Sequence, residues 1–218
     1  KYTYGDSWER YPIEAGEVWG LSDGSKVAVH DIFDPLPAWM QADLLFVDPP
    51  YNGGQLQGYY TKAELTPADF LLGFAFDHFV STLFARIQEI GAQTVYIEMG
   101  NQAVDLFQRE LAARFEHVQH WPVLYYRKHA TNLLRGSHLA PTPLDFTGID
   151  EARCISILAE RESYETIADP CMGRGLVGLA AYKSGHRFVG TELNKRRLAV
   201  LLDKLAKAGA EVARLERG

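Results

Sequence analysis

Short apolar runs alternate with longer amphipathic segments along most of this chain, and that alternation constrains the fold more than any other feature. Several short runs are apolar throughout, as strands buried on both faces of a sheet should be. The longer segments carry apolar residues at helical spacing, which is typical of helices that cover a sheet. The pattern predicts an α/β protein with a mostly parallel sheet. The expected strands are residues 26–30, 43–47, 94–98, 118–126, 165–168 and 187–191, and the expected helices are residues 66–90, 102–114, 176–183 and 195–207.

Length and composition predict one globular domain over residues 1–218, because 47% of the residues are hydrophobic and 23% are charged. Two stretches with glycine or proline, residues 52–65 and 128–149, are expected to be irregular. Loops of that length inside a compact domain are usually functional or mobile.

The composition also narrows the class of protein. No apolar run approaches the roughly 18 residues that a membrane helix needs, and the first residues lack the layout of a signal peptide. Cys154 and Cys171 are too few for a disulfide framework and have no nearby partners for a zinc site. We therefore expect a cytoplasmic protein without a structural metal. The net charge of −6 argues against tight nonspecific DNA binding, but it is compatible with a local basic face, a homodimer or a partner subunit.

The first chemical motif is Asp48-Pro49-Pro50-Tyr51, directly after the apolar run 43–47. A lone Asp-Pro would more simply mark the end of a strand. The full Asp-Pro-Pro-Tyr motif, at the edge of the sheet where such folds bind ligands, favours a catalytic site. An aromatic amine is a poor nucleophile because its lone pair is delocalised. Hydrogen bonds from its N–H groups to the Asp48 carboxylate and a backbone carbonyl at Pro49 would aim that lone pair outward, and Tyr51 offers a ring for stacking.

The second motif runs from Asp169 to Gly175 (DPCMGRG), between a predicted strand and a predicted helix. Glu192 ends the next strand, where an acidic side chain can accept both hydroxyls of a ribose. Residues 173–178 also read G-x-G-x-x-G, so a nicotinamide-dependent dehydrogenase is the rival interpretation. Asp169 argues against it, since this carboxylate would repel a pyrophosphate but could pair with the ammonium of a methionine moiety.

These residues resemble the amino-methylating DNA methyltransferases in their circularly permuted, beta-class arrangement, where the catalytic DPPY motif precedes the cofactor motif. Residues 16–51 and 166–205 carry the resemblance best, and residues 16–31 resemble that family's N-terminal strand pair. It implies a Rossmann-like class I fold with a seven-stranded sheet and helices on both faces. It also implies S-adenosylmethionine as cofactor and Asp48, Pro49, Pro50 and Tyr51 as catalytic residues. The expected cofactor-binding residues are Asp31, Asp169, Pro170, Cys171, Gly173, Gly175, Glu192 and Asn194. For Asp31, a turn-initiating role is an equal alternative.

The chain departs from this family at the glycine loop, which usually reads DPFxGSG. Cys171 replaces the Phe, Arg174 replaces the Ser, and the usual preceding Lys-Pro pair is absent. Another side chain is therefore needed to fill the space of the missing ring.

Little room remains for target recognition, and the candidate is a small insert at about residues 127–149. Its cations and aromatics could contact phosphates and stack on bases, although a solvated loop is an equal alternative. A second cluster, Tyr59, Tyr60 and Lys62, follows the catalytic motif and could close over a flipped base. Packing in the core is an equal alternative for its aromatic residues. The expected nucleic-acid-binding residues are Tyr59, Tyr60, Arg127, Lys128, His129, Asn132, Arg135 and His138.

The sequence thus predicts methyl transfer from S-adenosylmethionine to N6 of a flipped adenine in DNA. Cytosine N4 in DNA, an RNA amine, and a cofactor-poor accessory subunit of a methyltransferase complex remain alternatives.

Overall fold

Strand β3, Leu44–Val47, shows why the chain folds into layers. Successive side chains of a strand point to opposite faces of the sheet. Leu44 and Phe46 lie in one hydrophobic cluster and Leu45 and Val47 in another, and all four are buried. A strand of this kind needs helices on both of its faces.

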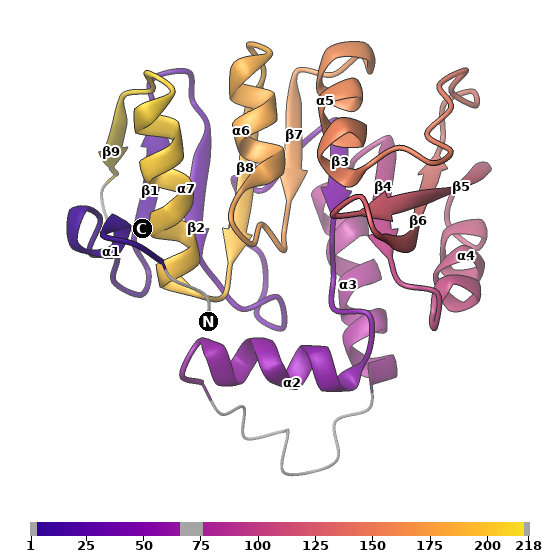
Figure 1. The fold of residues 1–218 in the computed structure, drawn as a ribbon, viewed down its shortest axis with the longest axis horizontal. Coiled ribbons are helices and arrows are strands. Elements are labelled where there is room, and N and C mark those ends of the chain that lie inside the picture. The colour runs from indigo at the N-terminus through magenta and orange to yellow at the C-terminus, as the bar shows by residue number, and fades with distance from the viewer. Residues whose placement is uncertain (1–3, 66–75, 216–218) are drawn as a thin grey trace.

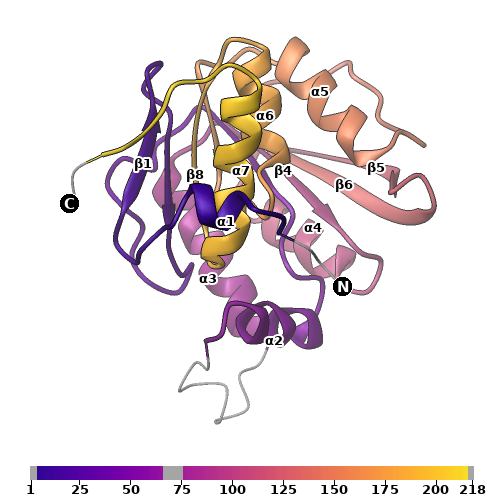
Figure 2. The same ribbon diagram turned by 60° about the vertical axis from the view of Figure 1, so that its left-hand side comes forward.

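The computed structural model describes residues 4–65 and 76–215, and within these ranges nine strands form one sheet between two layers of helices (Figure 1). Helices α5, α6 and α7 lie on one face of the sheet, and α3 and α4 lie on the other (Figures 1 and 2). The first three helices contribute to the first cluster, and α3, α4 and α2 contribute to the second. The strands are β1 Val18–Leu21, β2 Lys26–Val29, β3 Leu44–Val47, β4 Thr94–Met99, β5 His117–Tyr125, β6 His129–Ser137, β7 Thr166–Asp169, β8 Arg187–Glu192 and β9 Val212–Arg214. The helices are α1 Ser7–Arg10, α2 Gly53–Lys62, α3 Phe76–Ile90, α4 Val104–Ala112, α5 Glu151–Arg161, α6 Leu176–Lys183 and α7 Lys195–Lys207.

The strand order is β5-β6-β4-β3-β7-β8-β2-β1-β9. The five central strands, from β4 to β2, pair in parallel, whereas the pairings of β5, β6, β1 and β9 are antiparallel. The sheet of the described residues is therefore mixed and nine-stranded, which corrects the expectation of seven mostly parallel strands. The expected N-terminal strand pair is confirmed as β1 and β2.

Six strands and the helices α4, α6 and α7 match the predicted segments to within two residues at each end. Of the helix predicted over residues 66–90, the part at Phe76–Ile90 is confirmed as α3, and the predicted start at Thr66 lies outside the described residues. None of the described helices is both long and apolar enough to cross a membrane.

The two stretches expected to be irregular are so only in part, because residues 53–62 and 129–137 form regular elements, whereas residues 138–149 contain neither helix nor strand, as expected. Residues 129–137 form β6, which pairs with β4 on one side and β5 on the other. Several polar residues of β6 are buried, because partners on other elements satisfy their hydrogen bonds. The strand therefore lacks the apolar pattern that predicts a buried strand. Residues 53–62 form α2, whose N-cap Asn52 accepts a hydrogen bond from the Gln55 amide over 2.9 Å.

Candidate active site

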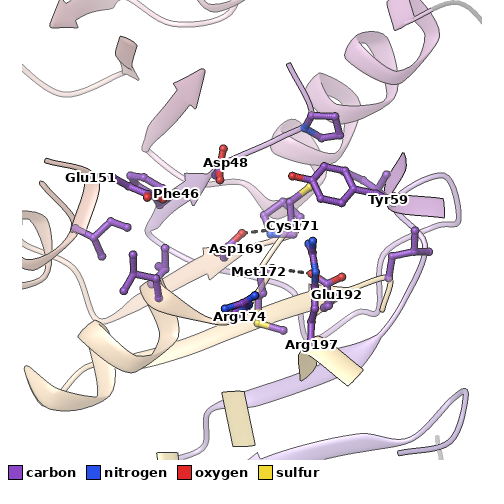
Figure 3. Close-up of a pocket in the computed structure, with 18 of the residues that line it drawn as sticks. Phe46, Asp48, Tyr59, Glu151, Asp169, Cys171, Met172, Arg174, Glu192 and Arg197 are labelled. Atoms are coloured by element: carbon purple, nitrogen blue, oxygen red, sulfur yellow. Dashed lines mark hydrogen bonds between the residues drawn. The ribbon is translucent and has the colours of Figure 1, made fainter. Parts of the chain in front are cut away.

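The carboxyl ends of β3, β7 and β8 open into one cavity of about 420 Å³ (Figure 3). Helix α2, the start of α5 and the turn between β5 and β6 form other parts of its wall. The cavity brings together predicted residues from both motifs, which are more than a hundred residues apart in the sequence. These lining residues are Asp31, Asp48, Pro50, Tyr59, Tyr60, Asp169, Pro170, Cys171, Gly173 and Glu192.

Asp48 follows the last residue of β3 and points into the cavity (Figure 3). Pro49 and Pro50 are buried and hold the chain as it leaves the sheet. The Tyr51 amide donates a 2.7 Å hydrogen bond to Gln55 Oε1 of α2. The Tyr51 ring packs on Gly100, where an added Cβ would lie only 2.8 Å from a ring carbon. Glycine at position 100 therefore makes room for the ring.

The glycine loop between β7 and α6 is held by hydrogen bonds to carboxylates. Asp169 Oδ1 accepts from the Cys171 amide over 3.0 Å, and Glu192 Oε2 accepts from the Gly173 amide over 2.6 Å. Gly173 and Gly175 have φ of 57° and 68°, which favour glycine. A Cβ on Gly173 would meet no atom within 4 Å, whereas one on Gly175 would lie 2.3 Å from Leu201 Cδ1. Gly175 thus serves helix packing, and Gly173 leaves open space beside the cavity.

Two of the expected cofactor-binding residues have internal contacts. Asp31 lines the cavity, but its Oδ1 accepts hydrogen bonds from Tyr60 Oη at 2.6 Å and from the Phe33 amide at 3.1 Å. Asn194 is buried, caps α7 by accepting from the Arg196 amide, and donates to the Lys62 carbonyl over 2.9 Å. Asn194 therefore fixes α2 to α7 and does not line the cavity.

A tyrosine ring from another element lies beside Cys171 (Figure 3). Tyr59 of α2 lines the cavity beside Cys171, in the region where the resemblance led us to expect a phenylalanine (Figure 3). The guanidinium of Arg197 lies 4.8 Å from the centre of the Tyr59 ring and contacts its face. Burial, reinforced by Asp169, raises the pKa of the Cys171 thiol well above its usual value, so the thiol stays protonated.

Cations line the opposite side of the cavity from Asp48 (Figure 3). Arg174, Arg197 and Lys204 all contribute to its wall, and Lys204 Nζ donates to the Arg174 carbonyl over 3.0 Å. None of the three was predicted as a site residue. Their side chains can bind a carboxylate.

Two further carboxylates lie beside Asp48, and neither was predicted. Glu98 lies on β4 in register with Asp48, since Val47 pairs with Ile97, and Glu151 is the first residue of α5. Carboxylate oxygens of Asp48, Glu98 and Glu151 lie within 4.8 Å of one another. Glu98 could have been suspected because it ends a predicted strand next to the catalytic one, whereas no sequence pattern marks Glu151.

Several carboxyl groups gather in the cavity, and their crowding and burial raise their pKa values. Burial, together with the neighbouring Glu151, raises the pKa of Asp48 to about 7, while Tyr51 and Arg197 act in the opposite direction. Burial also raises the pKa values of Asp169 and Glu192. Carboxyl groups in such an environment favour a cationic ligand over an anionic one.

The turn between β5 and β6 lies at the mouth of the cavity, and the residues Tyr125 and Tyr126 line it. Their rings meet edge to face with centroids 4.4 Å apart, and Tyr126 is 64% exposed. Tyr126 and Arg127 have φ of 49° and 57°, a conformation that costs free energy in residues with a side chain. The predicted Arg127, Lys128 and His129 are all exposed at this turn.

Four predicted nucleic-acid-binding residues either have internal partners or lie far from Asp48, although Tyr60 also lines the cavity. Tyr60 is buried and bonds to Asp31, and Asn132 is buried with donors directed to Met99 and Asn101. Arg135 is 2% exposed, donates to Gln119 and Ala140 and lies 3.9 Å from Glu162. His138 follows the end of β6 that pairs with Thr94, at the opposite edge of the sheet from Asp48. The hydrogen bonds of Tyr60, Asn132 and Arg135 therefore serve contacts within the fold.

The fold is similar to that of solved DNA methyltransferases. M1.HpyAVI in complex with SAM superposes with a TM-score of 0.52 at 13% identity over 82% of this chain and 98% of that chain. TTHA0409 from Thermus thermophilus, described as a putative DNA modification methylase and complexed with S-adenosyl-L-methionine, gives 0.57 at 16% identity over 83% and 93%. The cytosine-N4-specific PvuII DNA methyltransferase gives 0.50 at 12% identity over 81% and 84%. No protein-family model and no curated protein sequence matches the chain. At sequence identities this low, the similarity to these proteins is a similarity of fold.

Proposed function

We propose that this protein transfers a methyl group from S-adenosylmethionine to the exocyclic N6 of adenine in DNA. The observation that carries the proposal is that Asp48 of the first motif and Asp169 and Glu192 of the second line the same cavity. The amine-binding and cofactor-binding motifs thus face one reaction space. Because the catalytic motif precedes the cofactor motif in the chain, we assign the arrangement to the circularly permuted beta class.

The residues of the cavity fit this cofactor. Asp169 would pair with the ammonium group, Glu192 with the ribose hydroxyls, and Arg174 or Lys204 with the carboxylate of the methionine moiety. Tyr59 supplies a ring beside Cys171, and the open space next to Gly173 admits a ligand close to the backbone. When bound, S-adenosylmethionine supplies an electrophilic methyl group on a positively charged sulfur.

The carboxyl groups at the glycine loop also favour this function over that of a dehydrogenase. A nicotinamide dinucleotide would bring a pyrophosphate next to Asp169 and Glu192, two carboxylates that lie at the glycine loop. A sulfonium carries no phosphate, and its positive charge is complementary to these groups. This favours methyl transfer.

Asp48 and the chain after it prepare the target amine. The Asp48 carboxylate accepts one N–H of the amine and a backbone carbonyl at Pro49 accepts the other, which directs the lone pair of the nitrogen away from the ring. The buried prolines hold this geometry. Tyr51, packed on Gly100, and the exposed Tyr126 offer ring faces for the base or its neighbours.

DNA is the favoured polymer because the solved neighbours are DNA methyltransferases and because Arg127, Lys128 and His129 lie at the cavity mouth. A base in a duplex would have to be flipped to reach Asp48. Since the chain has a net charge of −6, a homodimer or a partner subunit would add affinity. Adenine is favoured because DPPY resembles adenine enzymes, and cytosine N4 is the second candidate because the PvuII enzyme shares the fold.

The test is methyl transfer from labelled S-adenosylmethionine to duplex DNA, single-stranded DNA and RNA, followed by nucleoside analysis. We expect N6-methyldeoxyadenosine with the wild-type protein and none with Asp48→Ala. N4-methyldeoxycytidine would select the second candidate, and undiminished transfer by Asp48→Ala would exclude the mechanism. Calorimetry with the cofactor should give a one-site isotherm, and no heat of binding would instead indicate the accessory role.

A further inference from the structure

Glu98 is a buried carboxyl group with an unsatisfied oxygen. It is 1% exposed, and its Oε1 accepts a 3.0 Å hydrogen bond from Thr131 Oγ1 of β6. No donor among the described residues reaches Oε2, and Glu98 belongs to the cluster with Asp48 and Glu151. A buried oxygen without a partner is costly, so this one requires either a proton of its own or a cation.

A proton on Glu98 satisfies the geometry with the atoms already present. Burial, with Asp48 and Glu151 adding repulsion, raises the pKa of Glu98 to about 10, so that the group is neutral at pH 7. The protonated Oε2 can then donate to a carboxylate of the cluster. Burial raises the pKa of Glu151, whereas hydrogen bonding from Glu98 lowers it.

Glu151 is the member of the cluster best placed to carry the charge. It opens the 11-residue helix α5, where the unpaired backbone N–H groups favour an anion, and it lines the cavity. Glu98 lies behind it and does not line the cavity. The charge on Glu151 in turn opposes ionisation of Asp48 and makes Asp48 a stronger base.

Other titratable groups surround the cluster from each packed element. Arg197 of α7 acts against the effect of Glu151 on Asp48, and Asp150 acts with burial on Glu151 itself. The groups that face the cluster are Tyr51, Tyr125, Asp150, Cys154, Asp169 and Arg197.

We propose that Glu98 and Glu151 form a carboxyl pair that shares one proton. The pair keeps a negative charge beside Asp48, and this charge makes Asp48 the group that receives the proton released by the methylated amine. This pair rests on the proposed function. Glu98 and Glu151 are positioning residues in this scheme, because neither needs to contact the reacting atoms. Asp48 is the catalytic base.

Atoms and electrons balance at the target nitrogen. An N–C bond forms while the C–S bond of the sulfonium breaks with its electron pair left on sulfur, so the positive charge passes from sulfur to nitrogen. One N–H bond of the resulting ammonium then breaks, its electron pair stays on nitrogen, and Asp48 takes the proton. The proton leaves through the cavity to water after the product dissociates.

The pair can be tested without any turnover. In protein labelled with carbon-13 at glutamate side-chain carboxyls, the Glu98 signal, identified by its loss in Glu98→Gln, should remain that of a neutral acid from roughly pH 5 to 8. Ionisation of Glu98 near the ordinary glutamate value would overturn the proposal. Stoichiometric binding of Mg²⁺ or Ca²⁺ to the wild-type protein but not to Glu98→Gln would also overturn it, because a cation would then neutralise the cluster.

The catalytic part is tested by the pH dependence of single-turnover methyl transfer. We expect the wild-type rate to rise with pH as Asp48 loses its proton, with a midpoint near 7. Glu151→Gln should move that midpoint down by about one pH unit or more, since a like charge at this distance is removed. Glu98→Gln should retain the wild-type midpoint, because its amide donates to Glu151 as the protonated acid does, and Glu98→Ala should shift it as Glu151→Gln does.

Cofactor affinity and melting temperature report whether each variant is folded. A Glu98→Gln midpoint that moves with that of Glu151→Gln, or a Glu151→Gln midpoint identical to wild type, would refute the pair. If the wild-type protein methylates no substrate while Glu98 stays neutral, the proposed function and the catalytic role of Asp48 are refuted. The carboxyl pair itself would still stand.

Discussion

The backbone amide of Arg127 donates a 2.6 Å hydrogen bond to Oδ1 of Asp150, so the turn between β5 and β6 is fastened to the start of α5. Asp150 is the N-cap residue of α5 but makes no side-chain hydrogen bond to its own helix. Its carboxylate instead holds the turn that carries Tyr126 and Lys128 over the cavity mouth.

We therefore expect Asp150→Ala to loosen the turn and to weaken DNA binding more than cofactor binding. The lost bond is worth about 1.5–3 kcal/mol with a charged acceptor, which corresponds to roughly a 10- to 150-fold weaker DNA complex if all of it appears in binding. Fluorescence anisotropy with labelled DNA and calorimetry with the cofactor measure the two affinities. Asp150→Asn, which keeps an acceptor oxygen, is the matched control. Equal losses in both affinities would contradict this role.

Tyr126 is exposed and held in a left-handed conformation at the same turn, an arrangement that favours contact with a base. Tyr126→Ala should weaken DNA binding by roughly 5- to 150-fold, because stacking on an aromatic side chain contributes about 1–3 kcal/mol per base. Tyr126→Phe keeps the ring and should bind as the wild type does. The anisotropy assay distinguishes these outcomes, and unchanged binding by the alanine variant would remove Tyr126 from the interface.

The two glycines of the cofactor loop should respond differently to alanine. Gly175→Ala combines a positive φ with a Cβ placed 2.3 Å from Leu201 Cδ1, so we expect a loss of about 2–4 kcal/mol in the free energy of unfolding. Gly173→Ala has the positive φ alone and should lose about 1–2 kcal/mol. Urea denaturation measures both. If the cavity holds the cofactor, Gly173→Ala should lose cofactor affinity in urea-free buffer, where the variant is fully folded.

Stability should fall as pH rises through the neutral range, because the pKa values of Asp48, Glu98 and Glu151 are raised in the folded protein. At any pH between the pKa values of the unfolded chain and the raised pKa values of the folded protein, the folded chain binds more protons than the unfolded chain. Deprotonation therefore favours unfolding. Glu151→Gln relieves this repulsion and should raise the melting temperature at pH 8 more than at pH 5.

For a chain of this size, each 1 kcal/mol of relief corresponds to about 2–4 °C. Differential scanning calorimetry at both pH values tests the expectation. Glu160→Gln, an exposed glutamate on the same helix, should show no such difference. A melting temperature of Glu151→Gln that falls equally at both pH values would mean that the charge stabilises the fold.

The strand before Asp48 was predictable because burial on both faces leaves an uninterrupted apolar run. The strands that end at Asp169 and Glu192 were predictable as short, mostly buried segments between helical ones. Strand β6 was not predictable from the same rule. Thr131, Asn132 and Arg135 are buried in it, and their polarity is compensated by partners on other strands and loops that no local pattern reveals. Glu151 was missed for a similar reason, since its neighbours Asp48 and Glu98 come from distant parts of the chain.

Helix α2 is fixed at both ends across the carboxyl edge of the sheet (Figure 1). Near its start, Asn52 Nδ2 donates to Gln102 Oε1 over 3.3 Å, and at its end the Lys62 carbonyl accepts from Asn194. Tyr60, bonded to Asp31, anchors it between these points. These three contacts hold α2 in place, so the wall of the cavity that it forms is preorganised. Discrimination between bases on this side would come from fixed shape, and any induced fit would be confined to the β5–β6 side of the mouth.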